Sequence, residues 1–234
     1  MKRIICVLLC VLMLAFCMVA CQKAQPAQDM TQSTTNVVTQ TVTESDAIIN
    51  PGEPGYADDF KVYDRIYNEN SKGEMSEVWV RLPQLASCNS GAGQVVENSN
   101  DTMILMGAQS LEDGNKFDTI EADKVLDEFF PFMDSSLRMF RRYDYKDFKF
   151  SVNTAEPTTI NGYSMCKYTG VHNYNYAGEP KTTNYVAYTA QLKKNGAFVY
   201  WLVFDDSDDH KNSELIDEYA TKIAYTLSEE DEED

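Results

Sequence analysis

An uncharged run of 17 residues, residues 4–20, constrains this chain more than any other feature of its sequence. Lys2 and Arg3 precede the run, so a short positive segment leads into an apolar core. A secretory signal peptide has this layout, with a small residue at the cleavage site. A run of 17 residues is also at the short end of what spans a bilayer. We therefore expect residues 1–20 to be a signal peptide that is absent from the mature fold.

The run ends with Met18, Val19, Ala20 and Cys21. This ending resembles the lipobox of bacterial lipoproteins, in which an aliphatic residue and two small residues precede a cysteine that is diacylated and becomes the new N-terminus. Met18 departs from the usual Leu, whereas Ala20 supplies the small residue that cleavage requires. The resemblance implies lipidation of Cys21, and two acyl chains anchor a protein stably where one does so only marginally. A plain N-terminal membrane helix and a secreted protein cut elsewhere are the alternatives.

The composition changes sharply after this cysteine. Gln, Thr, Ser, Ala, Pro and Asn dominate residues 22–56, and the first aromatic residue of the stretch is Tyr56. Such a segment cannot bury enough apolar area to offset the entropy of ordering it. We expect residues 21–58 to form a disordered Ser/Thr/Gln-rich tether, residues 59–228 to form a single domain, and residues 229–234 to form an acidic tail.

The charge balance restricts the partners of the domain. The formal charge is −17, and the loss of Lys2 and Arg3 with the signal takes it to −19. A surface of this sign repels nucleic acid and anionic lipid headgroups. We therefore expect no nucleic-acid partner and interpret the charge chiefly as a solvated acidic surface, with a basic partner as the alternative.

Two cysteines, Cys88 and Cys166, belong to the expected domain. In an exported domain a pair of cysteines suggests a disulfide, and two buried free thiols are an ordinary alternative. The sequence leaves both open. It contains no CxxC pair and no Cys/His cluster, which argues against a structural zinc site, and we expect no cofactor.

Alternating and continuous apolar patterns predict strands through most of the domain. The predicted strands are residues 61–67, 77–82, 101–108, 149–152, 163–171, 185–192 and 197–204. Asn161 and Gly162 offer a turn between two of them. Asn195 and Gly196 are predicted to form a type I′ turn, because Asn and Gly tolerate the positive φ angles that this turn requires.

Two segments have the three- and four-residue apolar spacing of amphipathic helices. The first is residues 121–140, with Pro131 inside it, where we expect a kink or a break. The second is residues 213–227, whose first turn Asn212 or Ser213 can cap. The sequence therefore predicts an α+β fold: strands, a helix, an antiparallel meander and a C-terminal helix.

This element order resembles the PsbP-like fold of the photosystem protein PsbP, the Ran-binding Mog proteins and many bacterial lipoproteins. The resemblance covers about residues 59–228. The local segments that carry the resemblance are residues 80–83 (VRLP), residues 160–163 (INGY), and the last hairpin followed by an amphipathic helix. The resemblance implies an antiparallel sheet flanked by helices on both faces, an α/β/α sandwich, used as a binding or assembly module generally without catalysis.

The sequence offers little for catalysis. Its two histidines, His172 and His210, fall in predicted polar loops or strand ends, where exposed side chains are expected. Residues 162–166 (GYSMC) superficially resemble a nucleophile elbow around Ser164, yet the closing Gly is missing and β patterns stand on both sides. A cavity that gathered His172 or His210 with Ser164 would favour an extracellular hydrolase; without one, we expect no enzyme.

The densest carboxylate cluster of the domain is Asp205, Asp206, Asp208 and Asp209. Carboxylates at this density can hold calcium. The EF-hand pattern fails, because Lys211 stands where its Gly is required and Asp217 where its final Glu is required. We favour a polar loop whose acids interact with the N-terminus of the following helix. A calcium-dependent module is the alternative.

Tyrosines concentrate in the meander, and Tyr168 and Tyr188 are candidates for a binding surface. Cross-strand aromatic pairs in a half-buried sheet give the same pattern, and we favour that structural interpretation. The sequence as a whole predicts a lipid-anchored binding or assembly module at the extracytoplasmic face of a cell membrane. Its expected partner is a protein, a peptide or an envelope component.

Overall fold

The computed structural model describes residues 49–69, 75–84, 86–89, 95–98, 100–109, 120–141, 145–207 and 209–230. Cys21, the tether before residue 49 and residues 231–234 lie outside these ranges, so what the sequence predicts for them stays a prediction. Within the described ranges, no helix is both long enough and apolar enough to cross a membrane.

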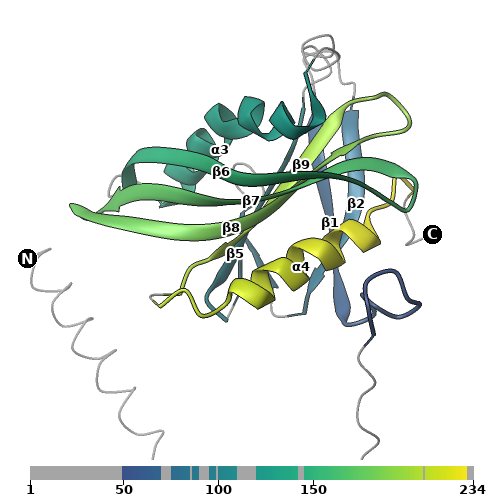
Figure 1. The fold of residues 1–234 in the computed structure, drawn as a ribbon, viewed down its shortest axis with the longest axis horizontal. Coiled ribbons are helices and arrows are strands. Elements are labelled where there is room, and N and C mark those ends of the chain that lie inside the picture. Colours follow the sequence, from purple (N-terminus) through teal and green to yellow (C-terminus); the bar gives the residue numbers. More distant parts are fainter. Residues whose placement is uncertain are drawn as a thin grey trace, which may run out of the picture. The chain divides into compact units, whose positions relative to one another are not determined.

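The described strands form two antiparallel sheets (Figure 1). β1 (Phe60–Glu69) and β2 (Met75–Pro83) pair as a two-stranded sheet. The larger sheet has seven strands in the order β3-β4-β5-β9-β8-β7-β6. Their bounds are Ala86–Asn89 (β3), Val95–Asn98 (β4), Thr102–Ala108 (β5), Tyr145–Ile160 (β6), Tyr163–Tyr176 (β7), Glu179–Gln191 (β8) and Phe198–Asp205 (β9).

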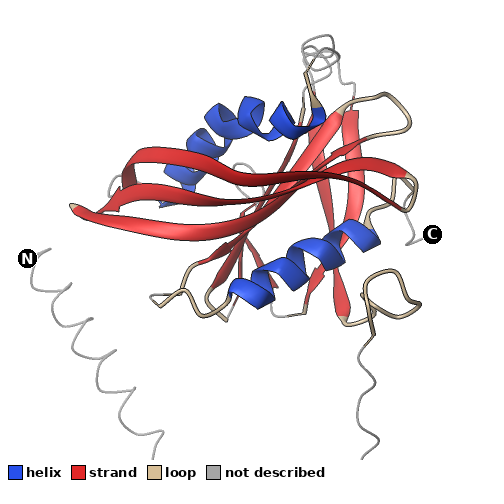
Figure 2. Cartoon of the chain, in the orientation of Figure 1, coloured by secondary structure: helices blue, strands red, loops and turns tan. Residues whose placement is uncertain are grey.

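The described helices lie on opposite faces of the larger sheet (Figure 2). α3 (Val125–Arg141), preceded by the short 3-10 helix η2 (Ala122–Lys124), covers one face, and α4 (Ser213–Thr226) covers the other together with β1 and β2. The predicted α+β class is confirmed. The sequence did not predict β3 and β4, because four residues each are too few to display an alternating pattern.

Two apolar cores follow from the alternation of side chains along the strands. On the central strand β9, residues 199, 201 and 203 point to the core beneath α4, whereas residues 200, 202 and 204 point to the core beneath α3. Trp201 is fully buried, and its indole N–H donates a hydrogen bond to the Ala220 carbonyl of α4 at 3.0 Å. This side chain therefore helps to fix where α4 lies on the sheet.

The hairpin turns differ from the predicted ones in one respect. Asn161 and Gly162, with φ of 51° and 76°, join β6 and β7 in the predicted place, and Ala177 and Gly178 form a similar turn between β7 and β8. The type I′ turn predicted for Asn195 and Gly196 is wrong. Of that pair only Gly196 has a positive φ, and its N–H donates to the Leu192 carbonyl at 2.9 Å across a longer loop.

The first amphipathic helix is not broken at proline. α3 continues through Pro131 from residue 125 to residue 141. A proline inside a helix leaves the carbonyl four residues earlier without its usual donor. Pro131 and Asp127 are both exposed, so water can reach the Asp127 carbonyl.

The folded domain begins earlier than residue 59. Residues 51–59 form consecutive turns, and the Tyr56 ring meets the Tyr225 ring of α4 edge-on, with centroids 5.4 Å apart. The chain divides into two compact units, residues 1–46 and residues 47–234. The folded domain therefore begins about ten residues before the boundary expected at residue 58. A segment rich in Pro and Gly still packs here, because the Tyr56 ring contacts the Tyr225 ring.

Candidate functional site

The structure favours the structural interpretation of the two candidate tyrosines over a binding surface. Tyr168 and Tyr188 are 0% and 2% exposed and lie in the two different cores, on opposite faces of the sheet. The Tyr168 hydroxyl donates to the Ala122 carbonyl at 2.6 Å, and the Tyr188 ring stacks on Trp201 with centroids 5.4 Å apart. Neither side chain can present a binding surface, because helices cover both faces of the sheet where these residues point.

The two histidines have different surroundings. His210 is exposed, as expected, whereas His172 is 1% exposed, which corrects the expectation for it. The His172 ring stacks on Phe150 and Tyr174 with centroids 4.3 and 5.0 Å apart, so it is a core residue of the α3 face. Among the described cavities, none joins a histidine with Ser164.

The disulfide left open by the sequence is not formed. Cys166 is a buried free thiol on β7, and burial raises the pKa of this thiol. Cys88 lies on β3, five strand positions away in the sheet order. Neighbouring strands are about 4.8 Å apart, whereas a disulfide needs Cα atoms within roughly 7 Å. The sheet topology therefore separates the two cysteines.

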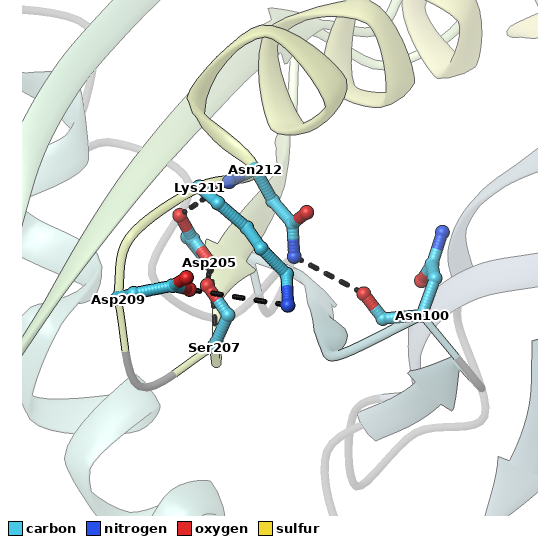
Figure 3. A network of polar contacts seen from close by, with 6 residues as sticks. All are labelled: Asn100, Asp205, Ser207, Asp209, Lys211 and Asn212. Atoms are coloured by element: carbon cyan, nitrogen blue, oxygen red, sulfur yellow. Dashed lines mark hydrogen bonds and ion pairs between the residues drawn. The ribbon is translucent and has the colours of Figure 1, made fainter.

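The carboxylate cluster is built around an inward-facing aspartate (Figure 3). Asp205 is fully buried, and its carboxylate accepts hydrogen bonds from the Ser207 hydroxyl, the Ser207 N–H at 3.1 Å and the Asn212 N–H at 3.0 Å. Asp209 is exposed, 3.9 Å from the Lys211 ammonium. Asp208 lies outside the described residues, and no group of three or more potential metal ligands occurs among the described ones. Asp205 therefore has a structural role, because its hydrogen bonds fix the loop that leads into α4.

Replacing Asp205 with alanine should destabilise the domain by about 2–3 kcal/mol, because the buried donors of Ser207 and the partly buried N–H of Asn212 would lose their acceptor. Urea unfolding followed by tryptophan fluorescence measures the loss. Asp209→Ala, in the same loop but exposed, is the matched control and should change stability little. Added calcium should leave both midpoints unchanged; a calcium-dependent rise that Asp205→Ala abolishes would instead favour the calcium module.

A cavity of about 760 Å³, lined by described residues, is called the end cavity below. Five segments distant in the sequence line it: residues 52–58, Arg81 near the end of β2, the β6–β7 turn, the β8–β9 loop, and residues 225–230 at and after the end of α4. The other described cavities measure about 320 to 440 Å³.

One wall of the end cavity, residues 52–58, is held by an ionic contact next to it. The Lys222 ammonium of α4 lies 2.7 Å from an Asp59 carboxylate oxygen and 2.8 Å from a Glu218 carboxylate oxygen. Burial lowers the pKa of Lys222, but its hydrogen bonds to Asp59 and Glu218 outweigh this and the net shift is upward. Lys222 therefore stays charged and ties the start of the domain to α4.

A carboxylate lies in a cradle of donors in the end cavity. The backbone N–H groups of Lys193 and Lys194 donate to the two Glu229 carboxylate oxygens at 2.7 and 2.9 Å. The Lys194 ammonium donates to the Glu229 carbonyl, and the Glu229 N–H donates to the Tyr163 hydroxyl at 3.2 Å. We call the two backbone N–H groups and the two lysine side chains the amide cradle. Consecutive backbone N–H groups of this kind bind anions.

The electrostatics of the amide cradle depend on the Tyr163 ring beneath it. The Lys193 ammonium lies 4.0 Å from the ring centroid and donates to the Asn161 carbonyl at 3.0 Å. Burial, and then the negative charge of Glu229, raise the pKa of the Tyr163 hydroxyl, which therefore stays neutral. Glu229, expected in a free acidic tail, is instead fixed to the domain.

No family model and no curated protein matches the chain. Among solved structures, it is similar to the cyanobacterial PsbP of Synechocystis sp. PCC 6803, at 12% identity over 71% of this chain and 91% of that chain, with a TM-score of 0.40. It is also similar to LpqN, described as involved in cell envelope biogenesis of Mycobacterium tuberculosis, at 17% identity, with the same coverage and a TM-score of 0.39.

A third similar structure is the Ran-binding protein Mog1p of Saccharomyces cerevisiae, at 11% identity over 69% of this chain and 89% of that chain, with a TM-score of 0.34. PsbP and Mog1p belong to the group that the element order of the sequence resembles. Because all three TM-scores are below 0.5 and all identities below 25%, these similarities do not indicate what this chain binds.

Proposed function

We propose that this chain is a lipoprotein anchored through Cys21 at the extracytoplasmic face of a membrane, and that its folded domain is a binding module with the end cavity as its binding site. The observation that carries the site is the cavity itself. At about 760 Å³ it has the size of typical ligand sites. Its tyrosine rings, backbone donors and cationic side chains supply the mixture of apolar walls and orienting polar groups that such sites use.

The lining favours binding over catalysis. The described residues around the cavity offer charges, hydrogen-bond donors and tyrosine rings, and they include no histidine or cysteine. Three cationic side chains, Arg81, Lys193 and Lys194, line the cavity in a chain with a formal charge of −17. Outside residues 228–230, the lining has two carboxylates, Glu53 and Asp58, so this part of the cavity is less acidic than the chain as a whole.

The anchor has a direct test. Cys21→Ala should move the protein from the membrane fraction to the soluble fraction and should abolish the mass increase that two or three acyl chains add to the mature chain. Cys17→Ala, which removes another cysteine of the same apolar run, should leave both unchanged. Retention of the Cys21→Ala protein in mature, membrane-bound form would contradict the anchor.

Site-specific photocrosslinking in native membranes tests the binding site. A photoreactive residue at Pro54, exposed at the end cavity, should crosslink a defined partner. The same residue at Lys124, exposed at the α3 face of the sheet, should not. Arg81→Glu, which reverses a charge in the cavity, should reduce the Pro54 product about tenfold, as the loss of one modest polar interaction does. Equal capture at both positions, or capture unaffected by Arg81→Glu, would place the partner elsewhere.

A further inference from the structure

The domain binds the backbone of residues 228 and 229 as well as the Glu229 carboxylate, as it would bind a peptide. Ser228 exchanges two backbone hydrogen bonds with Trp79 on β2, at 2.7 and 3.0 Å. The N–H and the carbonyl of Glu229 are both bound as well, by Tyr163 and Lys194. Backbone pairing with a strand and capture of a carboxylate by backbone N–H groups are two recurring modes of peptide recognition, and this segment uses both.

The surroundings suit an acidic peptide in particular. Lys193, Lys194 and Arg81 line the end cavity together with Ser228 and Glu229, and the lining outside residues 228–230 has two carboxylates, Glu53 and Asp58, against these three cations. Both Glu229 carboxylate oxygens receive a backbone donor, so an amide side chain, which offers one acceptor and two donors, fits the cradle poorly. The cavity extends past this segment to residues 52–58 and Tyr225, which leaves room for the rest of a ligand.

We infer that the end cavity binds an acidic peptide segment of a partner in the place now held by Ser228 and Glu229, and that the C-terminal segment of this chain competes for the same place. This assignment rests on the proposed function, since it names the ligand of that site. A segment of the same chain is present at a high effective concentration. The resident segment therefore weakens the binding of a partner until it is displaced.

The test uses the full chain and a peptide of known sequence. The probe is N-acetylated Leu-Ser-Glu-Glu amide, which reproduces residues 227–230, and the readout is the amide NMR shifts of Lys193 and Lys194. In Glu229→Ala the cradle loses its resident carboxylate, so the probe should bind about tenfold more tightly than to the unchanged chain, as expected for the loss of a charge-assisted contact. Glu214→Ala, with the same change of charge at an exposed position of α4 outside the cavity lining, should bind the probe as the unchanged chain does.

Two further probes define the ligand. A peptide with Gln at the position of Glu229 should shift the two amides much less than the Leu-Ser-Glu-Glu peptide, because it lacks the second acceptor. Acetate at equal concentration should also do less, because it lacks the backbone groups that pair with Trp79 and Tyr163. Glu229→Gln provides a second variant should Glu229→Ala fail to fold.

Several outcomes would overturn the inference: no shift of the Lys193 and Lys194 amides in a folded Glu229 variant, equal affinity in the Glu229 and Glu214 variants, or an equal response to acetate or the Gln peptide. They are distinguishable from a failure of the proposed function. Crosslinking at Pro54 without peptide binding would reject only the acidic ligand, whereas peptide binding without Pro54 crosslinking would reject the end cavity as the partner site in the membrane.

Discussion

Gly170→Ala should destabilise the domain by roughly 3 kcal/mol or more, at or above the upper end of the usual cost of overpacking, or prevent its folding. A Cβ at Gly170 would lie closer than 3.0 Å to the Ser151 carbonyl oxygen on β6 and to the Tyr185 ring on β8. The first obstacle is backbone and cannot rotate away. Gly170 pairs with Val152 and Tyr185, and its missing side chain lets the Tyr185 hydroxyl cross β7 and donate to the Ser151 carbonyl at 3.2 Å.

The loss can be measured by urea unfolding of purified Gly170→Ala against the unchanged domain. Gly107→Ala is the matched control, because there the atoms nearest to an added Cβ belong to the Tyr200 side chain rather than to backbone. We expect a smaller loss for Gly107→Ala. A Gly170→Ala protein within about 1 kcal/mol of the unchanged domain would contradict the packing of β6, β7 and β8 described above.

Trp201→Ala should cost about 3–5 kcal/mol, the usual range for deleting a fully buried large aromatic side chain. The change would remove the stacking of Trp201 on Tyr188 and its hydrogen bond to the Ala220 carbonyl, and would leave a void between β9 and α4. Because α4 leads into residues 225–230, looser packing of α4 should also loosen the wall of the end cavity.

Thermal unfolding followed by far-UV circular dichroism measures the Trp201 effect. Trp201→Phe keeps an apolar ring and should lose less, since the main deficit is then the hydrogen bond to Ala220. Equal losses for Ala and Phe would mean that the hydrogen bond, and not the packed ring, holds α4 on the sheet.

The elements that could be predicted from the sequence are those with long, one-sided patterns. Residues 121–140 and 213–227 show helical spacing, and the structure has α3 and α4 over nearly the same residues. Strand patterns also placed β5 and β9 within about a residue at each end. β6 and β8 were predicted too short, because their outer residues are largely exposed and polar, which removes the alternation that marks a strand.

The errors arose where a local pattern does not decide the surroundings of a residue. His172 was expected in a polar strand end, because its neighbours are polar, yet β7 continues to Tyr176 and the His172 ring lies in the core on the α3 face. Asn195 and Gly196 had the composition of a type I′ turn, yet the strands stop earlier and the loop takes another form.

The candidate site could not be predicted from the sequence, because its residues are distant from one another in the chain. Residues 52–58, Arg81, Tyr163, Lys193 and Glu229 converge through the order of strands in the sheet, which no local pattern encodes. One signal was available: Lys193 and Lys194 are adjacent cations at a predicted turn of a strongly acidic chain. Glu229 begins a run of acidic residues, and such a run is typical of a solvated tail.

Amide hydrogen exchange of the full chain in its native membranes, compared with the purified chain without partners, tests the binding site most directly. If the end cavity holds the partner, residues 51–58 and the β8–β9 loop at residues 192–197 should exchange more slowly in the membranes, whereas α3 should not change. Protection confined to α3 or to the outer edge of β6, with unchanged exchange around the end cavity, would contradict the account.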